Sequence, residues 1–215
     1  MLKDRKITKQ FNLITQNNIR NIFSITPCQE TTLVNFLKEL VIYNKHTNLV
    51  GKSTLIDPWR SHILDCIQIS LFIKNKYSTI IDIGTGAGLP GLVLAMMGYK
   101  NVSLVDSNGK KISFVKHVSK KLNINVRIFL NRIEKLNNKK FDFVISRALG
   151  NLSKLFTYSH KFINNETVLI FLKGKTVKNE IKEAKNIWSF HSEIYPSYSD
   201  ERGGVLIIKK LKLKT

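Results

Sequence analysis

The residues best placed to do chemistry are one acid and a series of glycines in the second quarter of the chain. Asp82 is followed by Gly84, Gly86 and Gly88 in the pattern D-x-G-x-G-x-G, directly after a short apolar run. This order predicts a strand, a tight turn and then a helix. Glycines let the backbone approach a ligand closely, and the first turn of a helix offers free amide donors. We therefore expect a small-molecule site at this turn.

Two cofactor classes fit the turn. Gly86, Gly88 and Gly91 also satisfy the dinucleotide pattern G-x-G-x-x-G, with Asp106 about 20 residues further on. Asp82 favours S-adenosylmethionine, because a carboxylate at a strand end attracts an ammonium group and repels a pyrophosphate. Asp106 would then accept hydrogen bonds from the ribose hydroxyls of the adenosyl group. A nicotinamide dinucleotide, or a structural turn without a ligand, is the alternative.

The elements around this turn indicate an α/β fold of the Rossmann-like, doubly wound type. Short apolar runs alternate with helical stretches, which is typical of a mostly parallel sheet. The predicted strands are 79–83, 102–105, 126–130, 141–145 and 168–172, and the predicted helices are 90–97, 110–122, 151–163 and 177–187. Strand-like segments at 192–195 and 205–209 have no helix between them. They predict an antiparallel C-terminal hairpin.

The chain before the turn is predicted to be helical. Thr26-Pro27-Cys28-Gln29 has the form of a capping box with proline at the first helical position, and it predicts a helix to about Asn44. Asp57-Pro58 repeats this start, and one face of the second helix would carry Ile63, Ile67 and Leu71. Residues 1–76 are thus expected to form a small helical cap packed on a methyltransferase domain at 77–215.

Composition points to an anionic partner. The formal net charge is +20, from 35 basic and 15 acidic residues, and such a surface attracts nucleic acid. A lysine-rich composition inherited from an AT-biased genome is the alternative origin. Arg132, Arg147, Lys173 and Lys175 follow predicted strands at the ligand-binding edge of the sheet, and they are candidate contacts for RNA phosphates or a base.

Other features limit the cellular setting. Cys28 and Cys66 are isolated, so we expect reduced thiols and neither a disulfide nor a metal site. No apolar run approaches the roughly 20 residues of a spanning helix, and the start, 1–10, lacks the apolar centre of a secretory signal. The expectation is a cytoplasmic monomer with no membrane association.

Several segments together resemble the bacterial 16S ribosomal RNA (guanine-N7)-methyltransferase family, also called glucose-inhibited division protein B. The segments occur in the family's order between about residues 40 and 210. They are Asn44-Lys45 with Asn48-Leu49, His62-Ile63-Leu64-Asp65, the turn from Asp82 to Gly91, Leu104-Val105-Asp106-Ser107 with Gly109-Lys110-Lys111, Arg132-Ile133-Glu134, Ser146-Arg147-Ala148, Leu172-Lys173-Gly174 and Glu201-Arg202.

The resemblance implies a methyl donor, S-adenosylmethionine, and a guanine of 16S ribosomal RNA as the target. It implies donor contacts at Gly84, Leu89, Ile133, Glu134 and Arg147. The chain departs from the family pattern at three positions. Ala87 stands where proline is usual, Ser61 where arginine precedes the histidine, and Gly203 where histidine is common.

Methylation at guanine N7 would suit this set of residues. N7 carries a lone pair and no proton, so no general base is required, and alignment and exclusion of water are the protein's tasks. The target guanine should lie in an opened or flipped position, because the major groove of A-form RNA is narrow and deep. The alternatives are a methyltransferase for a protein or small molecule, and a basic ribosome-assembly factor that binds RNA without catalysis.

Overall fold

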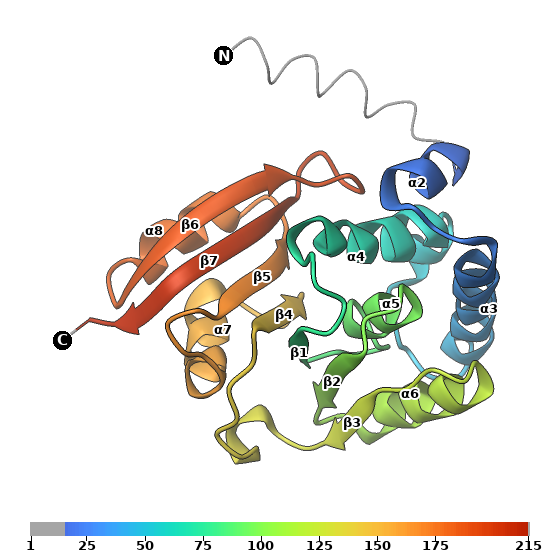
Figure 1. The fold of residues 1–215 in the computed structure, drawn as a ribbon, viewed down its shortest axis with the longest axis horizontal. Coiled ribbons are helices and arrows are strands. Elements are labelled where there is room, and N and C mark those ends of the chain that lie inside the picture. Colours follow the sequence, from blue (N-terminus) through green and yellow to red (C-terminus); the bar gives the residue numbers. More distant parts are fainter. Residues whose placement is uncertain (1–15, 215) are drawn as a thin grey trace, which may run out of the picture.

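The computed structural model describes residues 16–214, which form a seven-stranded sheet with helices on both faces (Figure 1). The strand order is β3-β2-β1-β4-β5-β7-β6. The strands are β1 (Thr79–Ile83), β2 (Asn101–Asp106), β3 (Arg127–Leu130), β4 (Phe143–Arg147), β5 (Val168–Lys173), β6 (Trp188–Pro196) and β7 (Gly204–Leu213). The helices are α2 (Gln16–Phe23), α3 (Pro27–Asn44), α4 (Asp65–Ile67), α5 (Gly91–Met96), α6 (Gly109–Lys121), α7 (Leu152–Ser159) and α8 (Val177–Ala184).

The sheet confirms the predicted Rossmann-like class. Strands β1 to β5 pair in parallel, and β7 enters antiparallel between β5 and β6. The order in which the chain adds strands reverses between β1 and β4, so the connections that follow these two strands diverge to either side of a crevice. The predicted hairpin is present but longer than expected. Residues 188–191 join β6, because Trp188 and Phe190 pack into the core beside Phe156.

The first predicted helix is confirmed as α3. Thr26 accepts a hydrogen bond from the Gln29 amide, and the Gln29 side chain accepts one from the Thr26 amide, which completes the capping box. Glu39 on this helix binds His117 and Lys121 of α6. These contacts fasten the N-terminal helices to the sheet layer.

The second predicted helix is present but is not a regular α-helix. Asp57 caps its start through the Arg60 amide, then a π-helical turn (Trp59–Leu64) leads into α4 and a 3₁₀ segment (Gln68–Phe72). The change of helix type rotates the side chains of the 3₁₀ segment relative to those of the π-helical turn. Ile63 and Ile67 lie on one buried face, whereas Leu71 is 43% exposed, so the prediction that all three share one face is wrong at Leu71.

One hydrophobic core unites the N-terminal helices with the sheet. It contains Leu33 and Phe36 of α3, Ile63 of the π-helical turn, and Leu104 of β2. A second core, centred on Phe156 and Phe171, fills the space beside α7 and α8. The boundary proposed between residues 76 and 77 falls just before β1, and residues 1–15 of the predicted cap lie outside the described residues. No helix within 16–214 is long and apolar enough to cross a membrane.

Candidate active site

The glycine-rich turn after β1 has the backbone that its sequence requires. Gly84, Gly86 and Gly88 have φ values of +70°, +58° and +87°, in the region that residues with a Cβ seldom adopt. A Cβ at Gly84 would lie 2.3 Å from Cδ1 of Leu149. The side chain of Leu149, after β4, therefore packs directly against the first glycine of the turn.

Asp82 lies beneath the turn and is fully buried. Its Oδ2 accepts hydrogen bonds from Thr85 Oγ1 at 2.6 Å and from the Gly91 amide at 2.8 Å. Its Oδ1 has no hydrogen-bond partner within the described chain. Burial raises the pKa of Asp82 to about 7. In this structure the carboxylate fastens the turn to the start of α5, and its contact with a methionine ammonium stays a prediction.

Asp106 closes the other side of the turn from the end of β2. Its Oδ2 accepts a hydrogen bond from the Gly86 amide at 2.8 Å, and its Oδ1 accepts one from the Asn108 amide at 2.8 Å. Each carboxylate oxygen keeps further acceptor capacity. Asp106 thus orders the turn and can still accept a hydroxyl.

A cavity of about 370 Å³ adjoins the turn, within the size range of small-molecule sites. The predicted residues that line it are Gly84, Gly86, Leu89, Asp106 and Arg147, and Lys111 and Leu149 line it as well. The segment 49–51 also lines it. The Asn44 side chain holds this segment through the Leu49 amide and both backbone groups of Val50.

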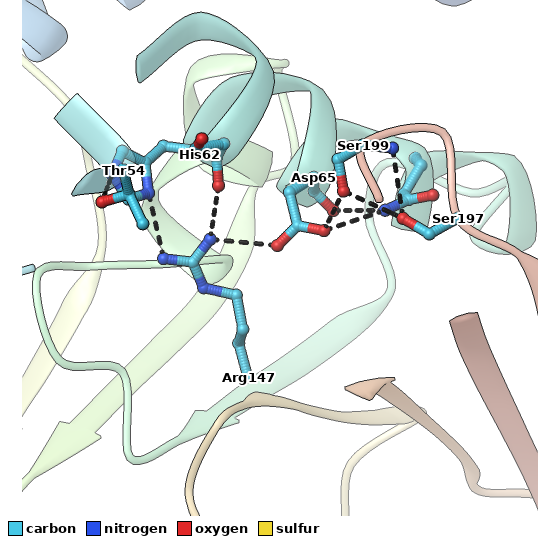
Figure 2. Close-up of polar contacts among 8 residues, drawn as sticks. Thr54, His62, Asp65, Arg147, Ser197 and Ser199 are labelled. Carbon is cyan, nitrogen blue, oxygen red and sulfur yellow. Dashed lines mark hydrogen bonds and ion pairs between the residues drawn. The ribbon is translucent and has the colours of Figure 1, made fainter. Parts of the chain in front are cut away.

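Arg147, at the end of β4, is fixed by the cap (Figure 2). Its Nη1 donates to the Ser61 carbonyl and to Asp65 Oδ2, both at 3.0 Å, and its Nη2 lies 3.1 Å from His62 Nδ1. His62 Nε2 lies 3.0 Å from Thr54 Oγ1. Burial, followed by the charge of Arg147, lowers the pKa of His62 to about 4. The histidine is therefore neutral at physiological pH.

A second cavity of about 740 Å³ lies on the other side of this group. Thr54, His62, Arg147 and Ala148 line both cavities and form the wall between them. The second cavity is also bordered by residues 172–174 and by the loop between β6 and β7. In Figure 2, Ser197 and Ser199 of that loop approach Asp65, whose Oδ1 accepts a hydrogen bond from Ser199 Oγ at 2.6 Å.

Comparison with known proteins identifies the family. Residues 29–203 match the model of the family described as GidB: rRNA small subunit methyltransferase G. The chain belongs to this family. It is similar to the ribosomal RNA small subunit methyltransferase G of Rhodospirillum rubrum (35% identity, covering 82% of this chain and 88% of that one). It is likewise similar to that of Rickettsia prowazekii (38% identity, 79% and 87%).

Solved structures that resemble this family member share its fold. They include a ribosomal protein L11 methylase from Lactobacillus delbrueckii, with a TM-score of 0.55 and 19% identity over 68% of this chain and 76% of that one. The TYW2 protein of M. jannaschii in complex with AdoMet gives a TM-score of 0.54 and 16% identity over 77% and 78%. Both likenesses concern the arrangement of sheet and helices.

The remaining predicted site residues of this methyltransferase family member differ in their surroundings. Ile133 is buried in the second core, and Glu134 beside it is exposed. Arg132 and Lys175 are exposed. Lys173 borders the second cavity, but its ammonium donates to the Gly150 carbonyl at 2.8 Å and pairs with Glu180 Oε2 at 2.6 Å. This lysine is held by the protein itself and is only 7% exposed.

The three departures from the family pattern have identifiable places. Arg60 lines the second cavity, where its Nε donates to the Ser199 carbonyl at 2.8 Å, and Ser61 serves through its backbone carbonyl. Gly203 also lines this cavity, and a Cβ there would lie 3.2 Å from the Lys173 carbonyl oxygen. Ala87 is buried in the turn.

Sequence reasoning missed several residues of the site. Thr54 lies on a 3₁₀ turn (Lys52–Leu55), and Ser199 lies on the loop between β6 and β7. Neither belongs to a recognisable motif. Lys111 could have been found, because its segment was part of the family resemblance and it follows the strand that ends in Asp106. No group of three or more metal-ligating side chains occurs within the described part of the chain.

Proposed function

We propose that the chain transfers a methyl group from S-adenosylmethionine to N7 of one guanine in 16S ribosomal RNA. The observation that carries this proposal is the pair of adjoining cavities at the carboxyl edge of the sheet. They share the wall made by Thr54, His62, Arg147 and Ala148, in a chain of the rRNA small subunit methyltransferase G family. One cavity suits the donor and the other suits the target base.

The smaller cavity fits the donor. The positive φ values at Gly84 and Gly86 give a turn whose backbone a ligand can approach closely, and both glycines line this cavity. Gly84, Gly86 and Leu89 would contact the methionyl part, and Asp106 would accept hydrogen bonds from the ribose. Ile133 and Glu134, after β3, would border the adenine, and Asp82 and Gly88 would hold the turn in shape.

The residues around the wall suit a reaction without proton removal. When bound, the donor supplies an electrophilic methyl group on a sulfonium sulfur. Guanine N7 already has a lone pair, so the protein needs to align the two reactants and exclude water. His62 uses both ring nitrogens in hydrogen bonds to Thr54 and Arg147. It is therefore not a free base directed at a substrate.

The larger cavity would receive a guanine displaced from its helix. N7 is inaccessible to side chains in the narrow major groove of A-form RNA, so the base must be presented by an opened structure. Arg60 and Arg202 lie at this cavity, whereas Arg132 and Lys175 are exposed near the same edge of the sheet. These cations would bind the phosphates beside the target.

We further propose that the protein acts as a monomer in the cytoplasm, where ribosomal subunits are assembled. The net charge of +20 supports the approach to RNA, although charge alone does not select the target. Methylation of a protein or a small molecule is less well supported, because neither accounts for this charge or for the family.

The test is transfer of a labelled methyl group to small ribosomal subunits from a strain that lacks this gene. Label should enter 16S ribosomal RNA of these subunits and should not enter subunits from the parent strain, whose site is already modified. Label in ribosomal protein would favour the protein methyltransferase, and a chain that binds neither the donor nor its product would favour the assembly factor.

A further inference from the structure

The wall between the two cavities contains a hydrogen-bond chain whose direction can be assigned. Thr54 Oγ1 donates its single proton to the Gly51 carbonyl at 2.6 Å. Toward His62 Nε2, the hydroxyl oxygen can then only accept. His62 therefore carries its proton on Nε2, and the lone pair of Nδ1 accepts a hydrogen bond from Arg147 Nη2.

The other side of the Arg147 guanidinium is fixed as well. Nη1 uses both of its N–H groups, one toward the Ser61 carbonyl and one toward Asp65. Asp65 is itself held through its second oxygen by Ser199 Oγ at 2.6 Å and by Gln68 Nε2 at 3.2 Å (Figure 2). The guanidinium is therefore clamped between the cap and the loop that follows β6.

Counting donors shows what remains free for a ligand. A guanidinium has five N–H groups, and three are used by Ser61, Asp65 and His62. The two that remain are on Nε and Nη2, which lie on one edge of the group. Such an edge matches a carboxylate or phosphate through two parallel hydrogen bonds. The donor's own carboxylate is a group of this kind, and Arg147 lines the donor cavity.

We propose that Thr54 and His62 are positioning residues, which orient Arg147 so that its Nε and Nη2 edge binds the carboxylate of the methyl donor. This inference rests on the proposed function, because it takes the smaller cavity as the donor site. It assigns to His62 a role in which the ring neither gains nor loses a proton. It also explains why a buried histidine is retained, since an apolar residue would leave Nη2 of Arg147 without its acceptor.

The test compares two ligands in the absence of RNA. S-adenosylhomocysteine carries the carboxylate, and 5′-methylthioadenosine lacks the whole amino-acid part. Their dissociation constants are measured by calorimetry for the wild-type chain, Thr54→Val, Thr54→Ser and His62→Met. Thr54→Ser is the matched control, because it keeps the hydroxyl. Thermal unfolding of each variant shows that the fold is retained.

We expect His62→Met to weaken the binding of S-adenosylhomocysteine by about 10-fold, because it removes a hydrogen bond to the charged Arg147. Thr54→Val should weaken it by about 3-fold to 5-fold, because the bond lost is between two neutral groups. Methylthioadenosine should bind all variants as it binds the wild type, and Thr54→Ser should resemble the wild type.

Three results would overturn the proposal. Equal losses for both ligands would mean a general effect on the cavity. Unchanged affinity for both ligands, with a raised KM for RNA, would assign the free edge of Arg147 to the RNA instead. A wild-type chain that binds neither ligand would overturn the proposed function together with this inference, so the two failures are distinguishable.

Discussion

The two cavities on either side of Arg147 are built in different ways. The donor cavity depends on backbone shape, because the glycines of one continuous turn line it and two carboxylates tie that turn down. The larger cavity depends on side chains from segments far apart in the sequence, as in the hydrogen bond from Arg60 to Ser199. A continuous backbone motif is visible in a sequence, whereas a site assembled by tertiary contacts is not.

The difference also concerns how each cavity tolerates change. The donor cavity has little freedom where the backbone itself is the contact surface, so one added methyl group should be enough to close it. The larger cavity is bordered by the loop between β6 and β7, in which Asp200 and Arg202 pair with each other at 3.0 Å. Substitutions in that loop should reduce the affinity for RNA gradually and should not abolish it.

The largest effect is expected at Gly84. Gly84→Ala places a methyl group 2.3 Å from Leu149 Cδ1 and should abolish measurable binding of S-adenosylhomocysteine by calorimetry. Gly86→Ala is the matched control. It has a similar φ, but the nearest protein atom to the new Cβ is Lys111 Nζ at 3.9 Å, so this substitution adds backbone strain of about 1–2 kcal/mol without the overlap with Leu149.

Leu149→Ala in the Gly84→Ala background should restore part of the binding, because it removes the overlapping atoms. If Gly84→Ala and Gly86→Ala weakened binding equally, the loss would come from backbone strain in the turn and not from the overlap with Leu149.

The second effect is a pair of opposite pH dependences. The folded pKa of His62 is lowered to about 4 from 6.5, so the unfolded chain binds the proton more tightly and stability from this group rises with pH between those values. The folded pKa of Asp82 is raised to about 7 from 3.8, so its contribution falls as pH rises through that window. The two slopes, each about 1.4 kcal/mol per pH unit at most, oppose one another in the wild type.

Single variants should separate these slopes in urea unfolding between pH 4.5 and 6.5. Relative to the wild type, Asp82→Asn leaves the His62 slope, so its free energy of unfolding should rise more steeply with pH. His62→Gln leaves the Asp82 slope, and its free energy of unfolding should fall. Parallel curves for the three proteins would mean that neither group has the shifted pKa.

A third effect separates two neighbouring lysines, of which Lys173 borders the larger cavity. Lys173→Met breaks the pair between Lys173 and Glu180, whose side chains are 7% and 14% exposed, and should cost about 3–5 kcal/mol of stability. Lys175→Met should leave stability within about 0.5 kcal/mol. If Lys175 contacts a phosphate, its loss should reduce the slope of log affinity against log salt by about 0.7–0.9.

Calorimetry and filter binding at several salt concentrations provide the two measurements for each variant. A stable Lys173→Met protein with a reduced salt slope would reverse these roles and return Lys173 to the RNA contact that its position in the sequence suggested.

Much of the fold could be predicted because it depends on local patterns. The alternation of apolar runs and helices predicted β1, β2, β3 and β5 to within one residue at each end and β4 to within two, and the capping box at Thr26 predicted α3. The exposed position of Leu71 could not be predicted, since it follows from a π-helical turn that changes the helical phase. Nothing local marks such a turn.

The site was predicted unevenly for the same reason. Gly84 and Asp106 were identified because the turn and the strand end are contiguous motifs, and both line the smaller cavity. Lys173 pairs with Glu180 of the next helix, and Thr54 lies within hydrogen-bond distance of His62. Neither contact corresponds to a local pattern in the sequence. The burial of Asp82 beneath the turn depends on how α5 packs, which the spacing of acids and glycines does not contain.

The central claim is that the two cavities bring the donor methyl group to guanine N7. The most direct measurement is chain scission of 16S ribosomal RNA after reduction and aniline treatment, which cleaves at N7-methylguanosine. Small subunits from a strain that lacks this gene are treated with the protein and S-adenosylmethionine before their RNA is extracted. This RNA should show one new cut, at a guanine, that is absent when the protein is omitted. Label incorporated into the RNA without any new cut would place the methyl group on another atom and contradict the claim.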